Sequence, residues 1–180
     1  MDIFILSLLS LFVLALLLTL LSTVLGFLFV HVPYVPTSWK TARAMVEAAG
    51  LKGTETVYDL GAGDGRILIT AKRLHPSIRA IGVELVPVVW LLGKVFVWWY
   101  GHPVSLRLGN ALSQDLRDAD CIFVYLITDV MPRFQKKFDA ELRKGTTVVS
   151  HAFRFPGHTP EREFSVQGIF GPTRVLVYRW

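Results

Sequence analysis

Residues 57–71, VYDLGAGDGRILITA, lead from a predicted strand through a glycine-rich turn into a predicted helix. Gly61, Gly63 and Gly65 leave backbone N–H groups uncovered at the positive end of the helix dipole, which is a common ligand-binding position. Dinucleotide-binding folds hold a pyrophosphate there with glycines spaced G-x-G-x-x-G, but Arg66 stands where the third glycine belongs. The stretch therefore predicts a ligand-binding turn in an α/β fold.

Three carboxylates surround this turn. Asp59 lies at the end of the strand, Asp64 lies between two glycines, and Glu84 ends the next apolar run, AIGVEL. These acids would repel a pyrophosphate and attract a ligand with an ammonium or sulfonium group. An acid at the tip of the second strand accepts the ribose hydroxyls of a nucleoside. The pattern favours S-adenosylmethionine over NAD. The alternatives are a plain strand-to-helix turn and, for Asp64, a helix cap.

The N-terminal part of the chain is strongly apolar. From Ile3 to Val30 it carries no charged residue and consists mainly of Leu, Phe and Val. About 20 such residues span a bilayer, whereas a signal peptide has a basic start and a shorter apolar core. We expect residues 1–30 to form a single-pass transmembrane anchor; a cleaved or buried helix is the alternative.

The flanks of this segment predict its orientation. No Lys or Arg precedes it, while Lys40 and Arg43 follow it. Because positive charge stays inside, the rest of the chain is expected on the cytoplasmic side of its membrane, or on the matrix side in an organelle.

Composition narrows the possible partners. The net charge is +5, but the basic residues are scattered and form no stripe interleaved with aromatics. We therefore expect attraction to anionic lipid rather than to nucleic acid. The single cysteine, Cys121, lies in an apolar run and agrees with a reducing compartment. The five histidines show no metal-ligand spacing, so no metal site is predicted.

Predicted strands and helices alternate along the rest of the chain. Two prolines in HVPYVPT, residues 31–37, favour an extended hinge, and Thr37 or Ser38 would cap a helix that ends at Gly50. Alternating strands and helices predict a doubly wound, mostly parallel sheet of the Rossmann-like α/β class, with a C-terminal antiparallel hairpin. Strands are expected at 56–60, 79–84, 104–108, 121–127 and 146–152, and helices at 65–75, 87–100 and 130–143.

The helix predicted within residues 86–101, VPVVWLLGKVFVWWYG, is apolar nearly all round. A helix covering one sheet face is normally polar on its other side, so something else must cover this one. Trp and Tyr are common at bilayer interfaces, and we expect the outer face to rest there. Burial against the N-terminal helix or a second copy is the alternative.

Several motifs of the chain together resemble those of a known family. VYDLGAGDGR with Glu84 resembles the first motif of class I S-adenosylmethionine-dependent methyltransferases. Together with HVPYVPT, GN at 109–110, YLITDVMPRFQKKFDAELRKGT and VVSHAF, it looks like the small archaeal protein-lysine methyltransferases. It is also similar to their mitochondrial relatives that methylate a lysine of the membrane-embedded ATP synthase c-subunit. The expected organisation is an anchor at 1–30, a hinge and helix at 31–55, and a methyltransferase domain at 56–180.

The resemblance implies roles for individual residues. The cofactor-binding residues would be Tyr34, Pro36 and Thr37 in a segment over the cofactor, Asp59, Gly61 and Gly63 at its methionine part, Glu84 at its ribose, and Asn110 and Ala111 near its adenine. The aromatic pattern of the helix at 86–101 is more pronounced than in the archaeal enzymes, which also lack the N-terminal anchor.

The end of the fourth predicted strand, YLITD at 125–129, is the expected acceptor site. Tyr125 would shape a lysine channel, and Asp129 would accept a hydrogen bond from the ammonium. A helix-capping role for Thr128 or Asp129 is equally open. His151, at the tip of the fifth strand, is a weaker candidate, since a lone histidine is more often structural. An N/D-P-P-Y signature of adenine or glutamine methylation is absent.

The leading hypothesis is a membrane-anchored, S-adenosylmethionine-dependent protein-lysine methyltransferase, with a membrane protein among the candidate substrates. The rivals are a methyltransferase of a lipophilic quinone or lipid, and a non-enzymatic anchored interaction module.

Overall fold

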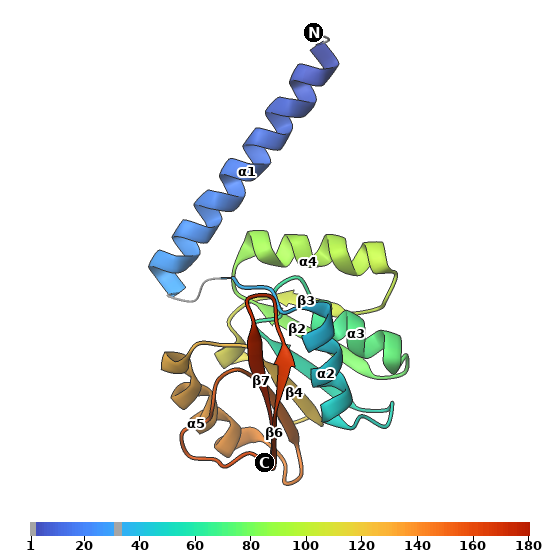
Figure 1. The fold of residues 1–180 in the computed structure, drawn as a ribbon, viewed down its shortest axis with the longest axis vertical. Coiled ribbons are helices and arrows are strands. Elements are labelled where there is room, and N and C mark those ends of the chain that lie inside the picture. Colours follow the sequence, from blue (N-terminus) through green and yellow to red (C-terminus); the bar gives the residue numbers. More distant parts are fainter. Residues whose placement is uncertain (1–2, 31–33) are drawn as a thin grey trace.

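The structure, a computed structural model, describes residues 3–30 and 34–180. Within the first helix it describes the side chains of residues 3–21 and 24, and His31, Val32 and Pro33 of the predicted hinge lie outside the described residues. The helix α1 (Ile3–Val30) projects from the remainder of the molecule, and its described side chains are exposed (Figure 1). Among the described residues it is the one helix long and apolar enough to cross a membrane. An N-terminal helix of this kind has the composition of a membrane span or of a signal sequence.

The other elements form a seven-stranded sheet in the order β3-β2-β1-β4-β5-β7-β6. The first five strands are parallel, while β7 pairs antiparallel with both β5 and β6. This is the predicted Rossmann-like α/β fold with its C-terminal hairpin. The strands are β1 (Thr56–Leu60), β2 (Arg79–Glu84), β3 (Ser105–Leu108), β4 (Cys121–Val124), β5 (Thr147–His151), β6 (Arg162–Gln167) and β7 (Pro172–Arg179).

Helices cover both faces of the sheet (Figure 1). The remaining elements are α2 (Trp39–Ala49), α3 (Arg66–Leu74), α4 (Pro87–Tyr100), α5 (Met131–Glu141) and the short 3-10 helices η1 (Ala111–Ser113) and η2 (Thr128–Val130). Because strand residues alternate between faces, Val57 joins a core with α2 and α3, whereas Tyr58 joins a second core with α5. Both cores are apolar, and their burial is the main stabilising contribution to the sheet.

Helix boundaries follow local signals. The Ser38 side chain accepts a hydrogen bond from the Thr41 N–H at the start of α2, so Ser38 rather than Thr37 is the cap. Gly50 ends that helix in the left-handed conformation, as predicted. No side chain caps η2 or α5, so neither Thr128 nor Asp129 has the alternative capping role.

The strand predicted at 121–127 is shorter than expected. Only Cys121–Val124 pairs with its neighbours, because Val124 lies opposite Leu60, the last residue of β1, and Ser150 near the end of β5. The apolar residues after Val124 therefore leave the sheet and run over its carboxyl edge.

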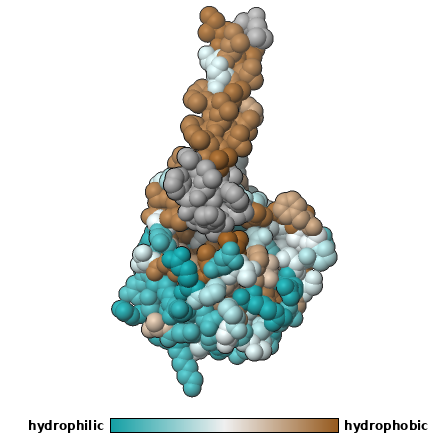
Figure 2. Space-filling view, turned by 90° about the vertical axis from the view of Figure 1, so that its left-hand side faces the viewer, coloured by the Kyte–Doolittle hydropathy of each residue, from teal (hydrophilic) through white to brown (hydrophobic). Residues whose placement is uncertain are grey.

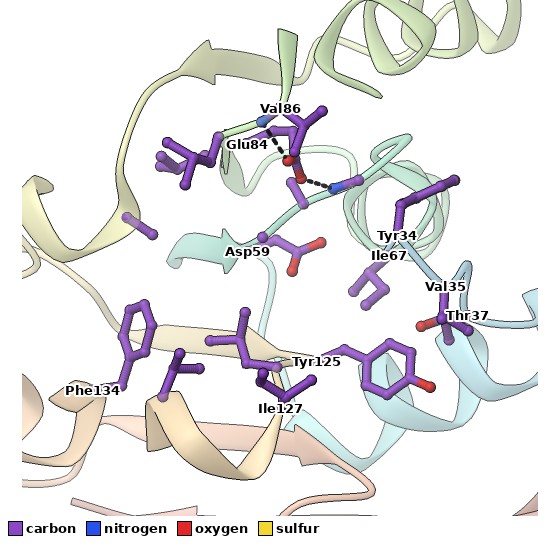
Figure 3. Close-up of a pocket in the computed structure, with 18 of the residues that line it drawn as sticks. Tyr34, Val35, Thr37, Asp59, Ile67, Glu84, Val86, Tyr125, Ile127 and Phe134 are labelled. Carbon is purple, nitrogen blue, oxygen red and sulfur yellow. Dashed lines mark hydrogen bonds between the residues drawn. The ribbon is translucent and has the colours of Figure 1, made fainter. Parts of the chain in front are cut away.

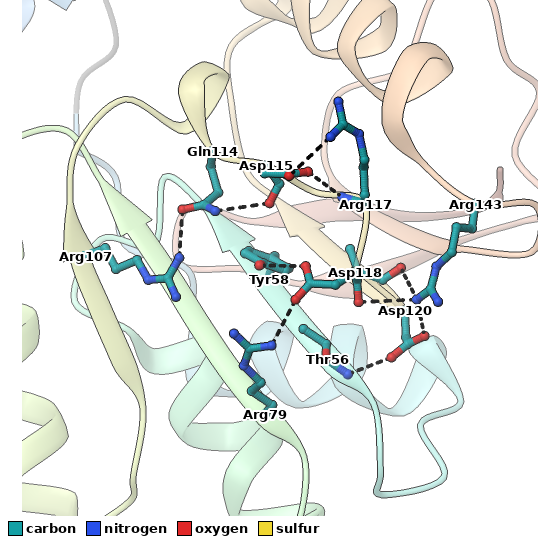
Figure 4. A network of polar contacts seen from close by, with 11 residues as sticks. Thr56, Tyr58, Arg79, Arg107, Gln114, Asp115, Arg117, Asp118, Asp120 and Arg143 are labelled. Carbon is teal, nitrogen blue, oxygen red and sulfur yellow. Dashed lines mark hydrogen bonds and ion pairs between the residues drawn. The ribbon is translucent and has the colours of Figure 1, made fainter.

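A polar network closes the opposite, amino-terminal edge of the sheet (Figure 4). Tyr58 donates to one oxygen of Asp118 and Arg79 to the other, both at 2.9 Å. Asp120 accepts the first N–H of β1, from Thr56, at 2.8 Å. Burial, with the neighbouring Asp118, raises the pKa of Tyr58 to about 12. The Asp120 contact pairs a backbone N–H group at the start of β1, and the network lies at the edge of the sheet opposite the site described next.

Candidate active site

A cavity of about 530 Å³ opens at the carboxyl ends of β1, β2 and β4, where open α/β sheets bind ligands (Figure 3). Ten residues predicted from the sequence line it: Tyr34, Pro36, Thr37, Asp59, Gly61, Gly63, Glu84, Asn110, Ala111 and Tyr125. They come from the hinge, β1 and its turn, β2, the segment after β3 and the segment after β4. The eleventh, Asp129, is exposed on η2 and does not line the cavity.

Glu84 is held rigidly at one wall. Its two carboxylate oxygens accept hydrogen bonds from the N–H groups of Gly63 and Val86, each at 2.9 Å (Figure 3). A carboxylate offers about four lone-pair sites, so both oxygens keep capacity for further donors such as ribose hydroxyls.

The turn at Gly61 and Gly63 is closely covered. Both have positive φ, and a Cβ on Gly63 would lie 2.8 Å from the Tyr34 ring. A Cβ on Gly61 would lie 3.0 Å from the Leu126 side chain. The glycines therefore allow both the turn conformation and the close approach of the hinge tyrosine.

Asp59 points into the middle of the cavity from β1 (Figure 3). It is buried, and no hydrogen bond within residues 34–180 involves its carboxylate. Burial, followed by the charges of Glu84 and Asp64, raises the pKa of Asp59 well above its usual range. A cationic group bound here would relieve this repulsion, so the electrostatics suit the ammonium end of S-adenosylmethionine.

Asp64 binds Arg66 instead of serving only as a cap. The guanidinium contacts both Asp64 oxygens, with Nε distances of 2.9 and 3.0 Å. It also donates to the backbone oxygen of Thr37. Arg66 thus connects the hinge to the ligand-binding turn, a role that sequence reasoning missed because it depends on contact between distant segments. Burial and then the charge of Asp64 raise the pKa of Tyr34 in the same cluster.

Tyr125 separates this cavity from a smaller one of about 170 Å³. Val35, Pro36 and Tyr125 line both cavities, and the turn between β6 and β7 lines only the second. The Tyr125 ring lies 3.9 Å from the His151 ring. Burial raises the pKa of Tyr125, which keeps its hydroxyl protonated.

His151 is held from both sides. Its Nδ1 lies 3.3 Å from the Thr37 hydroxyl and its Nε2 3.1 Å from the Thr173 hydroxyl. Burial lowers the pKa of His151 to about 4, so the ring is neutral at physiological pH. A neutral ring adds no positive charge to the smaller cavity, which His151 lines.

The other end of the main cavity is largely apolar. Asn110 and Ala111 lie there, and the Asn110 side chain accepts the Leu112 N–H at 2.9 Å. Apolar side chains that the sequence analysis did not single out complete the lining of the whole cavity: Ile67, Val86, Leu112, Ile127, Phe134 and Phe153. An apolar slot with one carboxylate at its edge suits an adenosine, and the acid-rich end suits its amino-acid part. Residues 34–180 and the described part of α1 contain no cluster of side chains that would hold a metal ion.

Comparisons with known proteins agree with this geometry. The family model of the ANTKMT methyltransferase domain matches residues 59–162. A protein-lysine N-methyltransferase of Saccharolobus islandicus is 37% identical over 139 residues, which cover 76% of this chain and 86% of that protein. The adenine nucleotide translocase lysine N-methyltransferase of Mus musculus is 34% identical over 137 residues, which cover 72% of this chain and 57% of that protein. This chain therefore spans little more than half the length of that relative.

A solved structure is similar as well. The RNA methyltransferase of Salinibacter ruber in complex with S-adenosyl-L-homocysteine has a TM-score of 0.74 and 31% sequence identity, covering 81% of this chain and 93% of that chain. Its bound product form of the cofactor agrees with the cofactor predicted here. With an archaeal relative matched over most of its length and a family match over residues 59–162, the chain belongs to the ANTKMT methyltransferase domain family and is a class I, S-adenosylmethionine-dependent protein-lysine N-methyltransferase.

Proposed function

We propose that α1 anchors this methyltransferase in a membrane and that its substrate is a lysine of a membrane-embedded protein. One observation carries the proposal: the exposed apolar helix α1 ends at Val30, only four residues before Tyr34, which lines the main cavity. Four extended residues reach at most about 14 Å. An anchored enzyme of this kind keeps its cavity close to the bilayer surface. Lys40 and Arg43 support an orientation with the catalytic domain on the cytoplasmic or matrix side.

The cavity residues receive the following roles in this proposal. Asp59 and the turn at Gly61 and Gly63 bind the amino-acid part of the cofactor, and Glu84 binds its ribose hydroxyls. Asn110 and Ala111 border the adenine, while Tyr34, Pro36 and Thr37 cover the bound molecule. When bound, S-adenosylmethionine supplies an electrophilic methyl group on a sulfonium.

The acceptor lysine is proposed to enter beside Tyr125, through the smaller cavity. A free lysine has a pKa of about 10.4 and must lose its proton before its nitrogen attacks the methyl carbon. An apolar channel favours the neutral amine, and the neutral His151 adds no charge that would repel an arriving ammonium. The lysine nitrogen forms the new C–N bond as the C–S bond breaks, and the lost proton passes to solvent. Asp129 lines neither cavity, so this proposal gives it no role in the step.

A lipophilic acceptor, a quinone or lipid, is the second candidate. The exposed aromatic side chains of α4 favour it, because they provide an apolar surface beside the cavity turn. The anchored interaction module has less support, since Asp59, Gly61, Gly63 and Glu84 all line one ligand-sized cavity.

The test uses the full chain in detergent micelles, methyl-tritiated S-adenosylmethionine, and membrane and soluble fractions from a host that lacks the gene. The label is separated into protein, organic-solvent and RNA fractions, and a Glu84→Ala chain is the control for cofactor-dependent transfer. We expect label in membrane-fraction protein, recovered as methyl-lysine after hydrolysis. Label in the organic solvent would replace the proposal with a lipid or quinone acceptor. Label in RNA or in soluble protein would also contradict it.

A further inference from the structure

The outer face of α4 is the most unusual surface of the domain. Trp98 and Trp99 are 77% and 76% exposed, and Leu91, Leu92 and Val95 on the same helix are exposed too. These five side chains remain uncovered although α1 contacts α4. The structure therefore does not bury these five residues against α1, which was one of the predicted alternatives.

Helical geometry places the five side chains together. At about 100° per residue, positions 91, 92, 95, 98 and 99 fall within an arc of roughly 120°. Gly93 and Val89, which are buried, lie on the opposite side. Lys94 falls just outside the apolar arc and is exposed. An apolar arc with aromatic residues and a lysine at its edge is the pattern of a helix lying in a membrane interface.

A second apolar projection comes from the turn between β6 and β7. Phe170 is 89% exposed and Ile169 is 50% exposed, and they lie beside Gly168 and Gly171 at the tip of the hairpin. This tip lies against the hinge, since it lines the smaller cavity together with Val35 and Pro36.

Both projections lie at the end of the domain where α1 arrives (Figure 1). The Trp39 ring at the start of α2 contacts Tyr100 at the end of α4, with ring centroids 5.2 Å apart. In Figure 1 the β6–β7 turn, α4 and the base of α1 lie at the same end of the molecule. Figure 2 shows hydrophobic surface on α1 and on parts of the domain nearest to it, whereas the far end of the domain is largely hydrophilic.

We propose that the outer arc of α4 and the β6–β7 turn form a docking surface that rests on the lipid bilayer beside α1. We call this the docking face: Leu91, Leu92, Val95, Trp98, Trp99, Ile169 and Phe170. A bilayer is the occupant that fits, because α1 is itself uncovered and apolar, both tryptophans suit the interface, and Lys94 stands where an anionic headgroup would meet it.

The docking face also determines where the opening of the smaller cavity lies relative to the bilayer. The Ile169 and Phe170 side chains belong both to the docking face and to the rim of that cavity. Resting on the bilayer, they place the rim at headgroup level. This step rests on the proposed function: the enzyme then selects lysines that lie in the headgroup layer, rather than lysines on domains that extend far from the membrane.

The test places fluorescent labels on the full chain in vesicles of phosphatidylcholine with phosphatidylglycerol. Single cysteines replace Trp98, Phe170 and, as a control on the opposite edge of the sheet, Arg117, and each carries a bimane group. The native Cys121 does not interfere, because it is buried and its pKa is raised by burial. Lipids carrying a nitroxide near the headgroup are the quenchers. We expect strong quenching at positions 98 and 170 and none above background at position 117.

Equal quenching at all three positions, or none at 98 and 170, would overturn the docking face. Extraction of the same vesicles with alkaline carbonate reports α1 anchoring separately, so a docking failure is distinguishable from an anchoring failure. Contact between two copies would instead give energy transfer between donor- and acceptor-labelled chains without lipid quenching, which also contradicts the proposal. The paired change Trp98→Ser with Trp99→Ser, at exposed positions, should lower methylation of membrane protein about tenfold. Cofactor affinity should stay unchanged.

Discussion

Asp59 and Glu84, the two acids proposed to bind the cofactor, repel each other and differ in how their charges are compensated. Glu84 is compensated by two backbone N–H groups, whereas Asp59 has no such partner within residues 34–180. Burying a carboxylate beside a second one disfavours its charged form, which is why the pKa of Asp59 is raised. The charged form of Asp59 is thus disfavoured in the structure, and the proposed ammonium group of the cofactor would offset this repulsion.

Replacing Asp59 by Asn should stabilise the unliganded protein. A carboxyl group whose pKa is raised by folding binds more protons in the folded state, so the wild type loses stability as pH rises from about 3.9, the unfolded value, toward the folded value. The Asn variant lacks this loss. Thermal unfolding of the full chain in detergent should give a higher Tm for Asp59→Asn at neutral pH and a smaller difference in acid. A lower Tm at neutral pH would contradict this account.

The same variant should alter the pH dependence of cofactor binding. Wild-type affinity should increase as pH rises through the raised pKa of Asp59 and its carboxylate ionises. Asp59→Asn should bind more weakly and should lack this increase. Calorimetric titration with S-adenosylmethionine at several pH values measures the affinity and its pH dependence. The same pH dependence in the two proteins would exclude contact between Asp59 and the ammonium.

Glu84→Gln should weaken cofactor binding without unfolding the protein. An amide keeps one acceptor oxygen but loses the charge that strengthens hydrogen bonds to hydroxyls, a loss of roughly 1.5–3 kcal/mol. The dissociation constant should rise about 10- to 150-fold. The exposed Glu161→Gln is the matched control and should bind normally. Unchanged affinity in Glu84→Gln with an intact fold would remove Glu84 from the site.

Sequence reasoning identified the cavity residues that belong to one local pattern. Asp59, Gly61, Gly63 and Glu84 are tied to strand ends and a tight turn, and the turn chemistry is readable from the letters. Arg66 was missed because its partners are Asp64 two residues before it and the Thr37 backbone in a separate segment. Asp129 is exposed and does not line the cavity, and only the fold shows which way a side chain on a short 3-10 helix faces.

At the scale of elements, α4 supports the ligand-binding turn on one side and is exposed on the other. A Cβ on Gly93 would lie 2.9 Å from the Gly63 backbone oxygen and 2.8 Å from the Leu106 side chain. The helix therefore packs directly on the turn, and only glycine allows this approach.

Gly93→Ala should disturb both stability and binding. The added methyl group meets backbone that has no space to move, so the free energy of unfolding should fall by roughly 1–3 kcal/mol. Displacement of the turn should raise the dissociation constant for the cofactor as well. Denaturant unfolding and calorimetry measure the two effects. Lys94→Ala, on the exposed side of the same helix, should change neither by more than about 0.5 kcal/mol. Wild-type behaviour of Gly93→Ala would contradict the packing described.

The helices and strands were predicted well where the spacing of apolar residues along the sequence determines them. The overlong strand at 121–127 marks the limit: apolar, β-forming residues continue to Ile127, but the neighbouring strand β1 ends at Leu60, opposite Val124. A single sequence does not show where a neighbour ends. The residues after Val124 consequently line the cavity instead of extending the sheet.

For the whole molecule, the order of segments along the chain brings the apolar helix α1 close to the cavity. The apolar helix α1 leads through the hinge to Tyr34, and the hinge residues Val35 and Pro36 line both cavities. The apolar character of α1 and α4 was evident from composition. The joining of the β6–β7 turn to the hinge was not, because it depends on how the C-terminal hairpin folds back across the sheet.

The most direct test of the central claim is a map of methyl-lysines in membranes of a host that lacks the gene, complemented with the full wild-type chain or with Glu84→Ala. Quantitative mass spectrometry would identify sites that require the wild-type cavity. We predict that these sites lie in membrane-embedded proteins, at lysines within the headgroup layer. Glu84-dependent sites confined to soluble proteins, or far from any membrane-spanning segment, would contradict the account.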